Sequence, residues 1–310
     1  MLTIEAASYF VPKTRLNLHE SLQRFSLTQL QARVFSAFYG LQQIPYAKGL
    51  SVTKLITQPI ETLLQKTNVD KQQVKYIIHS HTAQVITRFG RSVIRKVQQQ
   101  LDLGAAVAFG TSLNNCASTL NAFDMASVLL QCHDEQAKAI VVIGERAFTP
   151  TVQVIPHTSI MGDASAAVLV GLHGKEHRLL GQEMKTAGEF YRGVWLTAEE
   201  SKLFEQRYVS LLSETILLAV KNAGLTLDDI RLILPHNVNL ISWKNTAKAM
   251  CFPLEKIYLK NVKKYAHCFG ADIFINFVDV LAEKQLKPGD YYVMATVGLG
   301  ATFAAAVFQY

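Results

Sequence analysis

The chain has 310 residues, 49% of them hydrophobic and 18% charged, and a formal net charge of +7. This length and composition are typical of a globular protein and exclude a disordered or low-complexity chain; they fit one large domain or two tightly joined halves. No apolar run approaches the ~20 residues that cross a bilayer, and the first ten residues lack a signal-peptide pattern. The sequence therefore predicts a soluble, cytoplasmic protein without a membrane partner.

Basic residues are scattered along the chain, with one small cluster at Lys260, Lys263 and Lys264. No nucleic-acid recognition motif accompanies this charge, which argues against nucleic acid as a partner. A solvated basic face is the simplest interpretation, and an acidic partner protein or a phosphate-bearing substrate is the alternative. The four cysteines form no CxxC pair, so the sequence predicts neither a metal site nor a disulfide framework.

In chain order, the first clear pattern is an amphipathic helix over 60–68, followed by a polar turn and an apolar strand over 74–78. A strand over 105–109 and a helix over 120–130 come next, with Cys116 in the turn between them. Such a turn can place a side chain in a cleft, and the helix N-terminus behind it favours a thiolate. A buried structural cysteine is the competing interpretation, because free cysteine packs as a small hydrophobe.

Three pieces of the first half recur, in the same order, later in the chain. The helix and strand over 60–78 match 211–234, the apolar strand over 138–144 matches 289–295, and the Cys116 turn matches 265–272. Continuous apolar strands indicate burial on both faces, and their alternation with helices predicts α/β layers. We therefore predict an internal duplication, with one half over 1–170 and the other over 171–310.

Ligands of α/β sheets gather beyond the carboxyl ends of the strands. Cys116 from one half, and His236, His267 and Asp272 from the other, are expected to converge there. A cysteine nucleophile needs a base or an electropositive site, and His236 directly follows a buried strand, which suits a general base. Asp272 lies in a predicted helix over 271–282, where an acid that only stabilises the helix dipole is the alternative.

Cys116, His236 and His267 lie in a set of motifs that resembles the ketoacyl synthase III group of the thiolase superfamily. The motifs are, in order, Asn115-Cys116-Ala117-Ser118, the segment MGDASAAV over 161–168, His236-Asn-Val-Asn239, Tyr265-Ala-His267 and Gly298-Leu-Gly300. The ordered set extends from the strand over 105–109 to the end of the chain, whereas the N-terminal part matches only loosely.

The resemblance implies a thiolase fold, in which two duplicated halves form a five-layered αβαβα sandwich, and a homodimer or a heterodimer with another thiolase-fold chain. It implies acyl transfer from a coenzyme A or acyl-carrier-protein thioester to Cys116, with the thioester as substrate and no cofactor. The backbone N–H groups of Cys116 and Gly300 would form the oxyanion hole. Asn239 would support His236.

Two departures from the family leave the third catalytic residue open between His267 and Asp272. His267 takes the place of the family's asparagine, and a Cys-His-His set is compatible with decarboxylating condensation. Asp272 would instead give the Cys-His-Asp set of acyltransferases, where a carboxylate beside His236 fixes its tautomer and raises its basicity. The acceptor is a malonyl thioester, a hydroxyl, an amine or a carbon acid.

The segment at the expected coenzyme A entrance also departs from the family: residues 39–45 replace a Thr-Gly-Ile-Arg-like stretch. This favours a carrier protein, which the lysines at 260–264 could dock. We expect an acyltransferase or condensing enzyme of secondary metabolite, specialised fatty acid or polyketide biosynthesis. A catalytically silent partner of a heteromeric ketosynthase is the alternative, although Cys116 and His236 are intact; a hydrolase is a more distant one.

Overall fold

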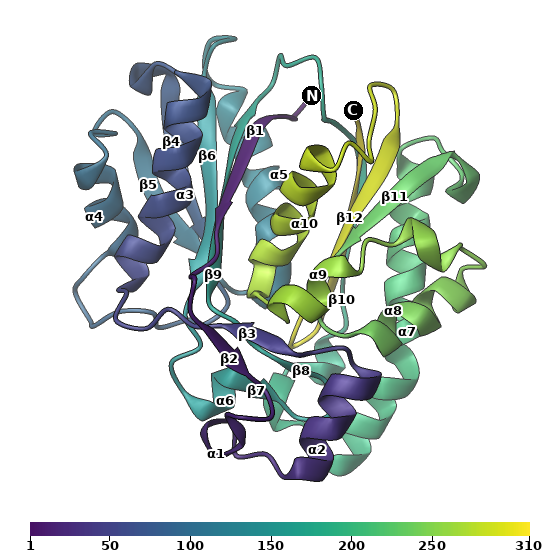
Figure 1. Ribbon diagram of the computed structural model, residues 1–310. Helices are drawn as coiled ribbons and strands as arrows, with labels where there is room; N and C mark the ends of the chain where they lie inside the picture. Colours follow the sequence, from purple (N-terminus) through teal and green to yellow (C-terminus); the bar gives the residue numbers. More distant parts are fainter.

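The computed structural model describes the backbone of residues 1–310 and every side chain except those of Pro150 and Thr151. Figure 1 shows two α/β halves side by side. The first half contains β1 (Thr3–Phe10), α3 (Val52–Thr67), β4 (Val74–Ser80), α4 (Val93–Gln100), β5 (Val107–Thr111), α5 (Ser118–Leu130), β6 (Lys138–Glu145) and β9 (Ala164–Gly171). The second contains β10 (Arg178–Thr186), α7 (Ala198–Asn222), β11 (Ile230–Pro235), α8 (Leu240–Ala249), α9 (Lys260–Tyr265), α10 (Asp272–Ala282), β12 (Tyr291–Gly298) and β13 (Thr302–Gln309).

The remaining short elements gather at the bottom of the view in Figure 1 and form a cap below the two halves. They are β2 (Arg15–Asn17), α1 (Leu22–Phe25), α2 (Gln29–Arg33), a π-helical turn (Val34–Phe38), β3 (Gln43–Pro45), α6 (Pro150–Gln153), β7 (Val154–Ile155) and β8 (Ser159–Ile160). The cap has its own apolar core, which includes Phe25, Phe35 and Ile160. This core holds the cap segments beside the carboxyl ends of the main strands.

The two halves have the same strand order and sense. In the first half the order is β5-β4-β6-β9-β1, with β4 parallel to both β5 and β6 and the other neighbours antiparallel. In the second half it is β11-β12-β13-β10, with one parallel pair, β11 and β12, followed by antiparallel pairs. The counterpart of β5 is reduced to one parallel bridge between Ile233 and Ile257. A single pairing of Thr3 with Arg178 joins the halves.

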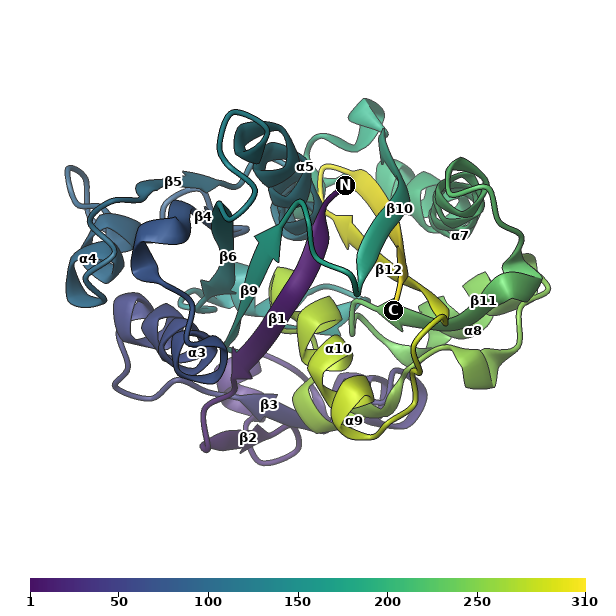
Figure 2. The same cartoon turned by 90° about the horizontal axis from the view of Figure 1, so that it is seen from above.

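Helices form three layers around these two sheets, as Figure 2 shows. The central layer is α5 and α10, whose Phe123 and Phe274 rings lie 5.3 Å apart in the largest buried cluster. Helices α3 and α4 cover the outer face of the first sheet, and α7 and α8 cover that of the second. The strands are therefore buried on both faces, which is why their sequences are continuous apolar runs.

The predicted duplication and the five-layered αβαβα arrangement are confirmed, and the matched strands are β4 with β11 and β6 with β12. Some boundaries differ: the helix expected over 60–68 is Val52–Thr67, and the helix expected over 120–130 begins at Ser118. The strand expected over 105–109 is Val107–Thr111, because Ala106 donates its N–H to Leu103 in a preceding turn. None of the described helices is both long and apolar enough to span a membrane.

Candidate active site

The candidate site lies where two matching turns, one from each half, come together. Cys116 occupies the 3₁₀ turn Asn115–Ala117 that opens α5, and the turn Phe269–Ala271 opens α10. A Cβ on Gly270 would lie 2.2 Å from Thr119 Oγ1 and 3.0 Å from the Cys116 carbonyl oxygen. A Cβ on Gly298 would lie 1.9 Å from the Asn114 carbonyl oxygen. Only glycine permits these approaches, so the two glycines allow the halves to meet around Cys116.

Cys116, His267 and Asp272 form a continuous chain of contacts. The Cys116 sulfur lies 3.8 Å from His267 Nε2, and His267 Nδ1 lies 2.5 Å from Asp272 Oδ2. All three side chains are buried, with 5%, 2% and 0% of their residues' surface exposed, respectively. The prediction left His267 and Asp272 as alternatives, and the structure places them in one ion pair behind the thiol.

The Asp272 carboxylate contacts His267 and not the ring of His236, which the Cys-His-Asp alternative would require. Asp272 Oδ2 also accepts the backbone N–H of Asn237 at 2.6 Å, and Oδ1 accepts the N–H of Cys268 at 2.7 Å and the Asn237 amide at 3.2 Å. Together with His267, these donors give each carboxylate oxygen of Asp272 two hydrogen-bond partners. The reason for the difference is local: the first turn of α10 directs Asp272 back onto its own loop, and that loop carries His267.

The two histidines of the site are held in opposite charge states. Burial lowers the pKa of His267, but the charge and hydrogen bond of Asp272, together with the Cys116 thiol, outweigh it and raise the pKa to about 10. Burial, and then the positive charge of His267, lower the pKa of His236 to about 3 against a smaller effect of the Ala295 carbonyl. At neutral pH His267 is an imidazolium beside the sulfur, which favours the thiolate, and His236 is a neutral base or hydrogen-bonding group.

His236 is fixed from the second half of the chain. Its ring lies 5.7 Å from that of His267 and 5.4 Å from that of Trp243, centroid to centroid. Trp243 Nε1 donates to the His236 carbonyl oxygen at 2.8 Å. His236 Nε2 lies 3.0 Å from the hydroxyl oxygen of Tyr208, a residue of α7 that the sequence analysis did not identify. No local signal marked Tyr208, because it lies on an amphipathic helix with many similar positions.

Two further predicted site residues lie outside this chain of contacts: Asn239 lies at the start of α8, and Gly300 lies in the loop between β12 and β13. Asn239 caps α8: its side-chain oxygen accepts the N–H of Ser242 at 2.7 Å, and its amide donates to the Thr158 carbonyl at 3.0 Å. Gly300 adopts a left-handed φ of +113° in the loop whose Leu299 carbonyl accepts from the Asn115 side chain. The loop thus lies against the Cys116 turn, and the oxyanion-hole role of Gly300 and the supporting role of Asn239 stay predictions.

The segment Met161–Gly162–Asp163 braces the His267 loop. Gly162 donates its N–H to the His267 carbonyl at 2.8 Å, and a Cβ on Gly162 would lie 2.6 Å from the Pro45 ring and 3.0 Å from the Tyr265 carbonyl oxygen. Asp163 accepts the N–H groups of Ala47 and Ala147, each at 2.8 Å. The Gly-Asp pair therefore joins the cap and the first half to the turn that carries His267.

A second buried carboxylate, Glu145, was also missed. It ends β6, is 1% exposed, and accepts the backbone N–H groups of Thr82 and, at 2.7 Å, Ala83. Thr82 Oγ1 in turn lies 3.5 Å from the Cys116 sulfur. Burial raises the pKa of Glu145 to about 7, although the hydrogen bonds and the charge of His267 act in the opposite direction. The signal in the sequence was an acid at the end of an otherwise apolar strand.

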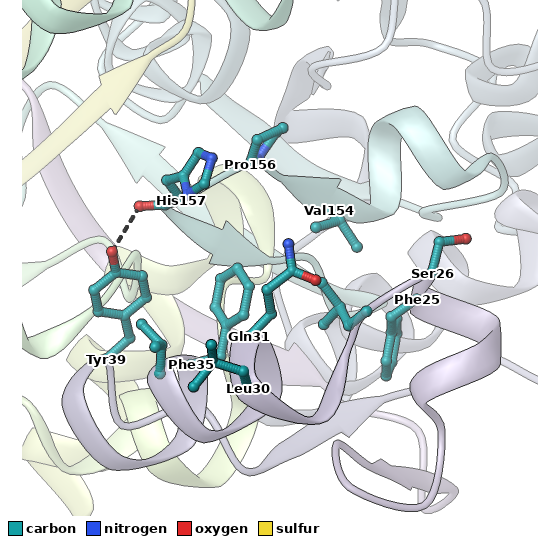
Figure 3. A pocket seen from close by; sticks show the side chains of 11 residues that line it. Phe25, Ser26, Leu30, Gln31, Phe35, Tyr39, Val154, Pro156 and His157 are labelled. Atoms are coloured by element: carbon teal, nitrogen blue, oxygen red, sulfur yellow. Dashed lines mark hydrogen bonds between the residues drawn. The ribbon is translucent and has the colours of Figure 1, made fainter.

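One cavity lies between the cap and helices α7 and α8, and a second lies within the cap. A mouth cavity of about 290 Å³ is lined by Tyr39, His157, Thr158, Phe204, Glu205, Tyr208, Val209, Asn239, Ile241, Ser242 and Asn245. An apolar cavity of about 330 Å³ lies beside it, between the helical turns of the cap and the segment 154–157 (Figure 3). The Tyr39 hydroxyl donates to the His157 carbonyl at 2.9 Å, and these two residues line both cavities (Figure 3). No Lys or Arg is among the lining residues of either cavity.

Comparison with known proteins agrees with this architecture. The family described as 3-oxoacyl-[acyl-carrier-protein] synthase III, C terminal, matches residues 220–310. The β-ketoacyl-[acyl-carrier-protein] synthase III of Aquifex aeolicus is 25% identical over 279 residues, which cover 87% of this chain and 88% of the relative. That of Ruegeria sp. is 24% identical and covers 85% of each chain.

Solved structures share the fold along the whole chain. The acyltransferase ChlB3 superimposes with a TM-score of 0.87 at 18% identity, covering 99% of this chain and 97% of its own. The Aquifex aeolicus synthase III superimposes with a TM-score of 0.82 at 21% identity over 100% of both chains. Xanthomonas campestris OleA, with bound lauric acid and lauroyl-CoA, has a TM-score of 0.83 at 16% identity and covers 100% of this chain and 99% of its own. The chain therefore has the fold of the synthase III enzymes and is similar in sequence to them over most of its length.

Proposed function

We propose that the protein is an acyl-thioester-dependent acyltransferase or condensing enzyme that works through an acyl-Cys116 intermediate. The observation that carries this proposal is the buried Cys116–His267–Asp272 chain, with 3.8 Å between sulfur and Nε2 and 2.5 Å between Nδ1 and carboxylate. A thiolate held beside an imidazolium is an activated nucleophile. The geometry and the match to synthase III relatives support an enzyme over a catalytically silent partner subunit.

The first half-reaction forms the acyl-enzyme. The Cys116 thiolate attacks the thioester carbonyl, a new carbon–sulfur bond forms, and the carrier thiol leaves with a proton from the His267 imidazolium. The backbone N–H groups of Cys116 and Gly300 would stabilise the oxyanion, an effect of ~3 kcal/mol for a well-placed donor. In the second half-reaction, an acceptor attacks the acyl carbon, the bond to Cys116 breaks, and neutral His236 takes the acceptor's proton.

Intact-protein mass spectrometry tests this proposal. Wild-type protein and Cys116→Ala are incubated with a panel of acyl-coenzyme A and acyl-carrier-protein thioesters. We expect an added acyl mass in the wild type that is absent in Cys116→Ala. Cys132 is an exposed free cysteine, so Cys132→Ala is the matched control and should retain the adduct. If no donor acylates the wild-type protein, the silent-subunit alternative gains support; rapid release of free acid without an acceptor would favour a hydrolase.

For the donor, we propose a carrier-protein thioester. The lining residues of both cavities include no Lys or Arg, and Glu205 adds an acidic group at the mouth, which disfavours the phosphates of free coenzyme A. Of the predicted docking lysines, Lys260 pairs with Glu283 at 2.7 Å and Lys264 with Asp279 at 3.9 Å. These ion pairs reduce the charge available to a partner.

A second basic face lies closer to the mouth. Ser242 and Asn245 of α8 line the mouth cavity, and Lys244 and Lys248 are exposed on the same helix. We therefore add these lysines to the docking surface for an acidic carrier protein. Replacing both with Glu should raise the carrier-thioester KM by about tenfold, and less at high salt. The KM for a small N-acetylcysteamine thioester should not change; an unchanged carrier KM would remove this surface.

We also propose a homodimer formed through β5. This strand is at an edge of the sheet, and beside it Val107 and Val128 are 59% and 64% exposed. An exposed apolar edge strand is a template for pairing with another chain, and antiparallel pairing of β5 with its own copy gives a closed two-fold assembly. Light scattering should show a dimer in the wild type and a monomer in Val107→Lys; a wild-type monomer would contradict the proposal.

A place in secondary metabolite, specialised fatty acid or polyketide biosynthesis fits the replaced segment over 39–45 and the apolar cavity beside it. The acyl mass that adds to Cys116 is the first measurement that would narrow this assignment.

A further inference from the structure

Tyr208 lies between the mouth cavity and the catalytic residues. It lines that cavity together with Asn239 and Phe204, and its hydroxyl oxygen lies 3.0 Å from His236 Nε2. Cys116 is 5% exposed and is not among the residues that line the mouth cavity. The phenol ring thus stands where an acceptor would pass on its way to the acyl-enzyme.

The ring of Tyr208 packs against aromatic neighbours. It packs edge-on against Phe204 at 5.6 Å and against Phe303 at 5.8 Å, centroid to centroid. Phe303 lies in β13, directly after the glycine loop that contacts the Cys116 turn. Burial, and then the charge of Cys116, raise the pKa of Tyr208, so the hydroxyl stays protonated at neutral pH. A neutral O–H therefore occupies the hydrogen-bonding position on His236 Nε2.

The acceptor's nucleophilic group needs this same position, because a general base must lie within hydrogen-bond reach of the proton that it removes. We propose that Tyr208 is a gating residue: its hydroxyl shields the acyl-enzyme from water and is displaced by an acceptor that presents an alcohol or phenol hydroxyl to His236. This inference rests on the proposed function, since it requires an acyl-Cys116 intermediate.

The chemistry of the site favours a hydroxyl over other acceptors. An alcohol substitutes its own O–H for the O–H of Tyr208 and brings no charge to His236, which is buried and neutral. A protonated amine would bring a charge into the buried space beside neutral His236, and burying such a charge without a partner is costly. In the step itself, the alcohol oxygen bonds to the acyl carbon, the bond to sulfur breaks, and the hydroxyl proton passes to His236 and on to the departing thiolate.

The test compares Tyr208→Phe with wild type, using water and methanol as probes of the acyl-enzyme. The variant keeps the ring and its packing but vacates the position on His236, which a water molecule can then take. A neutral hydrogen bond of ordinary net strength corresponds to about a fivefold change, so we expect acyl-Cys116 to hydrolyse about fivefold faster. In aqueous methanol the variant should also form more methyl ester than wild type, whereas methylamine should give no added amide.

Tyr292→Phe is the matched control, because Tyr292 lies 3.1 Å from His177 Nδ1 in a buried Tyr–His pair at the opposite end of β12. Its acyl-enzyme should have the wild-type lifetime. Equal lifetimes of acyl-Cys116 in Tyr208→Phe and wild type would overturn the gate, as would the same acceleration in Tyr292→Phe. Failure of the proposed function gives a different result, namely that no acyl mass adds to any of the three proteins.

Discussion

The two halves of the molecule build the same turn and use it for different chemistry. Each turn begins with a residue in the left-handed region, Asn115 with φ of 50° and Phe269 with φ of 56°, and continues through a 3₁₀ turn into a central helix. The middle residue is Cys116, the proposed nucleophile, in the first half and Gly270 in the second. The next helix begins with Ser118 in one half and with Asp272 in the other.

The matched strand ends differ in the same way. Glu145 is the last residue of β6, and Gly298 is the last residue of β12, which has the same length. Gly298 leaves room for the Asn114 backbone, whereas Glu145 places a carboxylate behind Thr82 and Cys116. The comparison shows that duplication fixes the backbone geometry of such a site and that single residues then assign the nucleophile, the cation and the carboxylates.

The largest effect is expected from Asp272→Asn, which removes the charge that distinguishes the second turn. Without the carboxylate, burial dominates and the pKa of His267 falls below its ordinary value, so the imidazolium beside Cys116 is lost at neutral pH. We expect acylation of Cys116 at neutral pH to slow by about a hundredfold or more, with this loss developing as pH rises through the lowered pKa of His267. Stopped-flow acylation across the pH range measures this.

Asp229→Asn is the control for that measurement, since Asp229 is an exposed acid that accepts the Thr226 N–H in another 3₁₀ turn. Its acylation rate should equal that of wild type. If Asp272→Asn, shown to be folded by near-UV circular dichroism, also acylates at the wild-type rate, the ion pair has no part in activating Cys116.

A smaller effect is expected from Glu145→Gln, the change that removes the first half's buried carboxylate. Because the folded-state pKa of Glu145 is raised to about 7 from 4.5, its contribution to stability is fully present below pH 4.5 and is lost as pH rises through 7. The free energy of unfolding of wild type should therefore fall by roughly 1–3 kcal/mol relative to the variant over this window. Urea unfolding at a series of pH values measures the difference.

Glu135→Gln, on an exposed loop, should follow wild type at every pH of that series. A constant offset between wild type and Glu145→Gln, with no dependence on pH, would mean that Glu145 is not protonated on folding and would contradict its raised pKa.

The smallest effect is expected from Ala266→Gly, beside His267. Ala266 has φ of 53° and ψ of −148°, a conformation that favours glycine, and it is fully buried. Such backbone strain costs about 1–3 kcal/mol, and part of the relief is offset by the greater freedom of glycine in the unfolded chain. We expect a net stabilisation of about 0.5–1 kcal/mol in equilibrium unfolding.

Ala271→Gly is the matched control, because Ala271 is equally buried but has a helical φ of −72°. It should destabilise the protein. Destabilisation by both changes to a similar extent would show that the backbone at Ala266 carries no relievable strain.

The sequence by itself determined the fold class and indicated the main members of the candidate site. The repeated helix–turn–strand pattern predicted the duplication, and continuous apolar runs such as 138–144 predicted strands buried on both faces. The turn between a strand and a helix marked Cys116, and residues at or near strand ends marked His236 and His267. These features are local, because periodicity and turn composition reflect the immediate surroundings of each residue.

Only the tertiary structure decided how these groups are paired. The sequence suggested that Asp272 acts on His236, but the carboxylate turns back to His267, five residues earlier, and His236 meets Tyr208 of α7 instead. Glu145 accepts the backbone N–H of Thr82, whose hydroxyl lies beside the Cys116 sulfur, and no other residue near the end of its apolar strand pointed to the site. The physical reason is that a hydrogen-bond partner depends on the rotation of a helix and the packing of layers to within about an ångström, and the spacing of residues along the chain does not specify this.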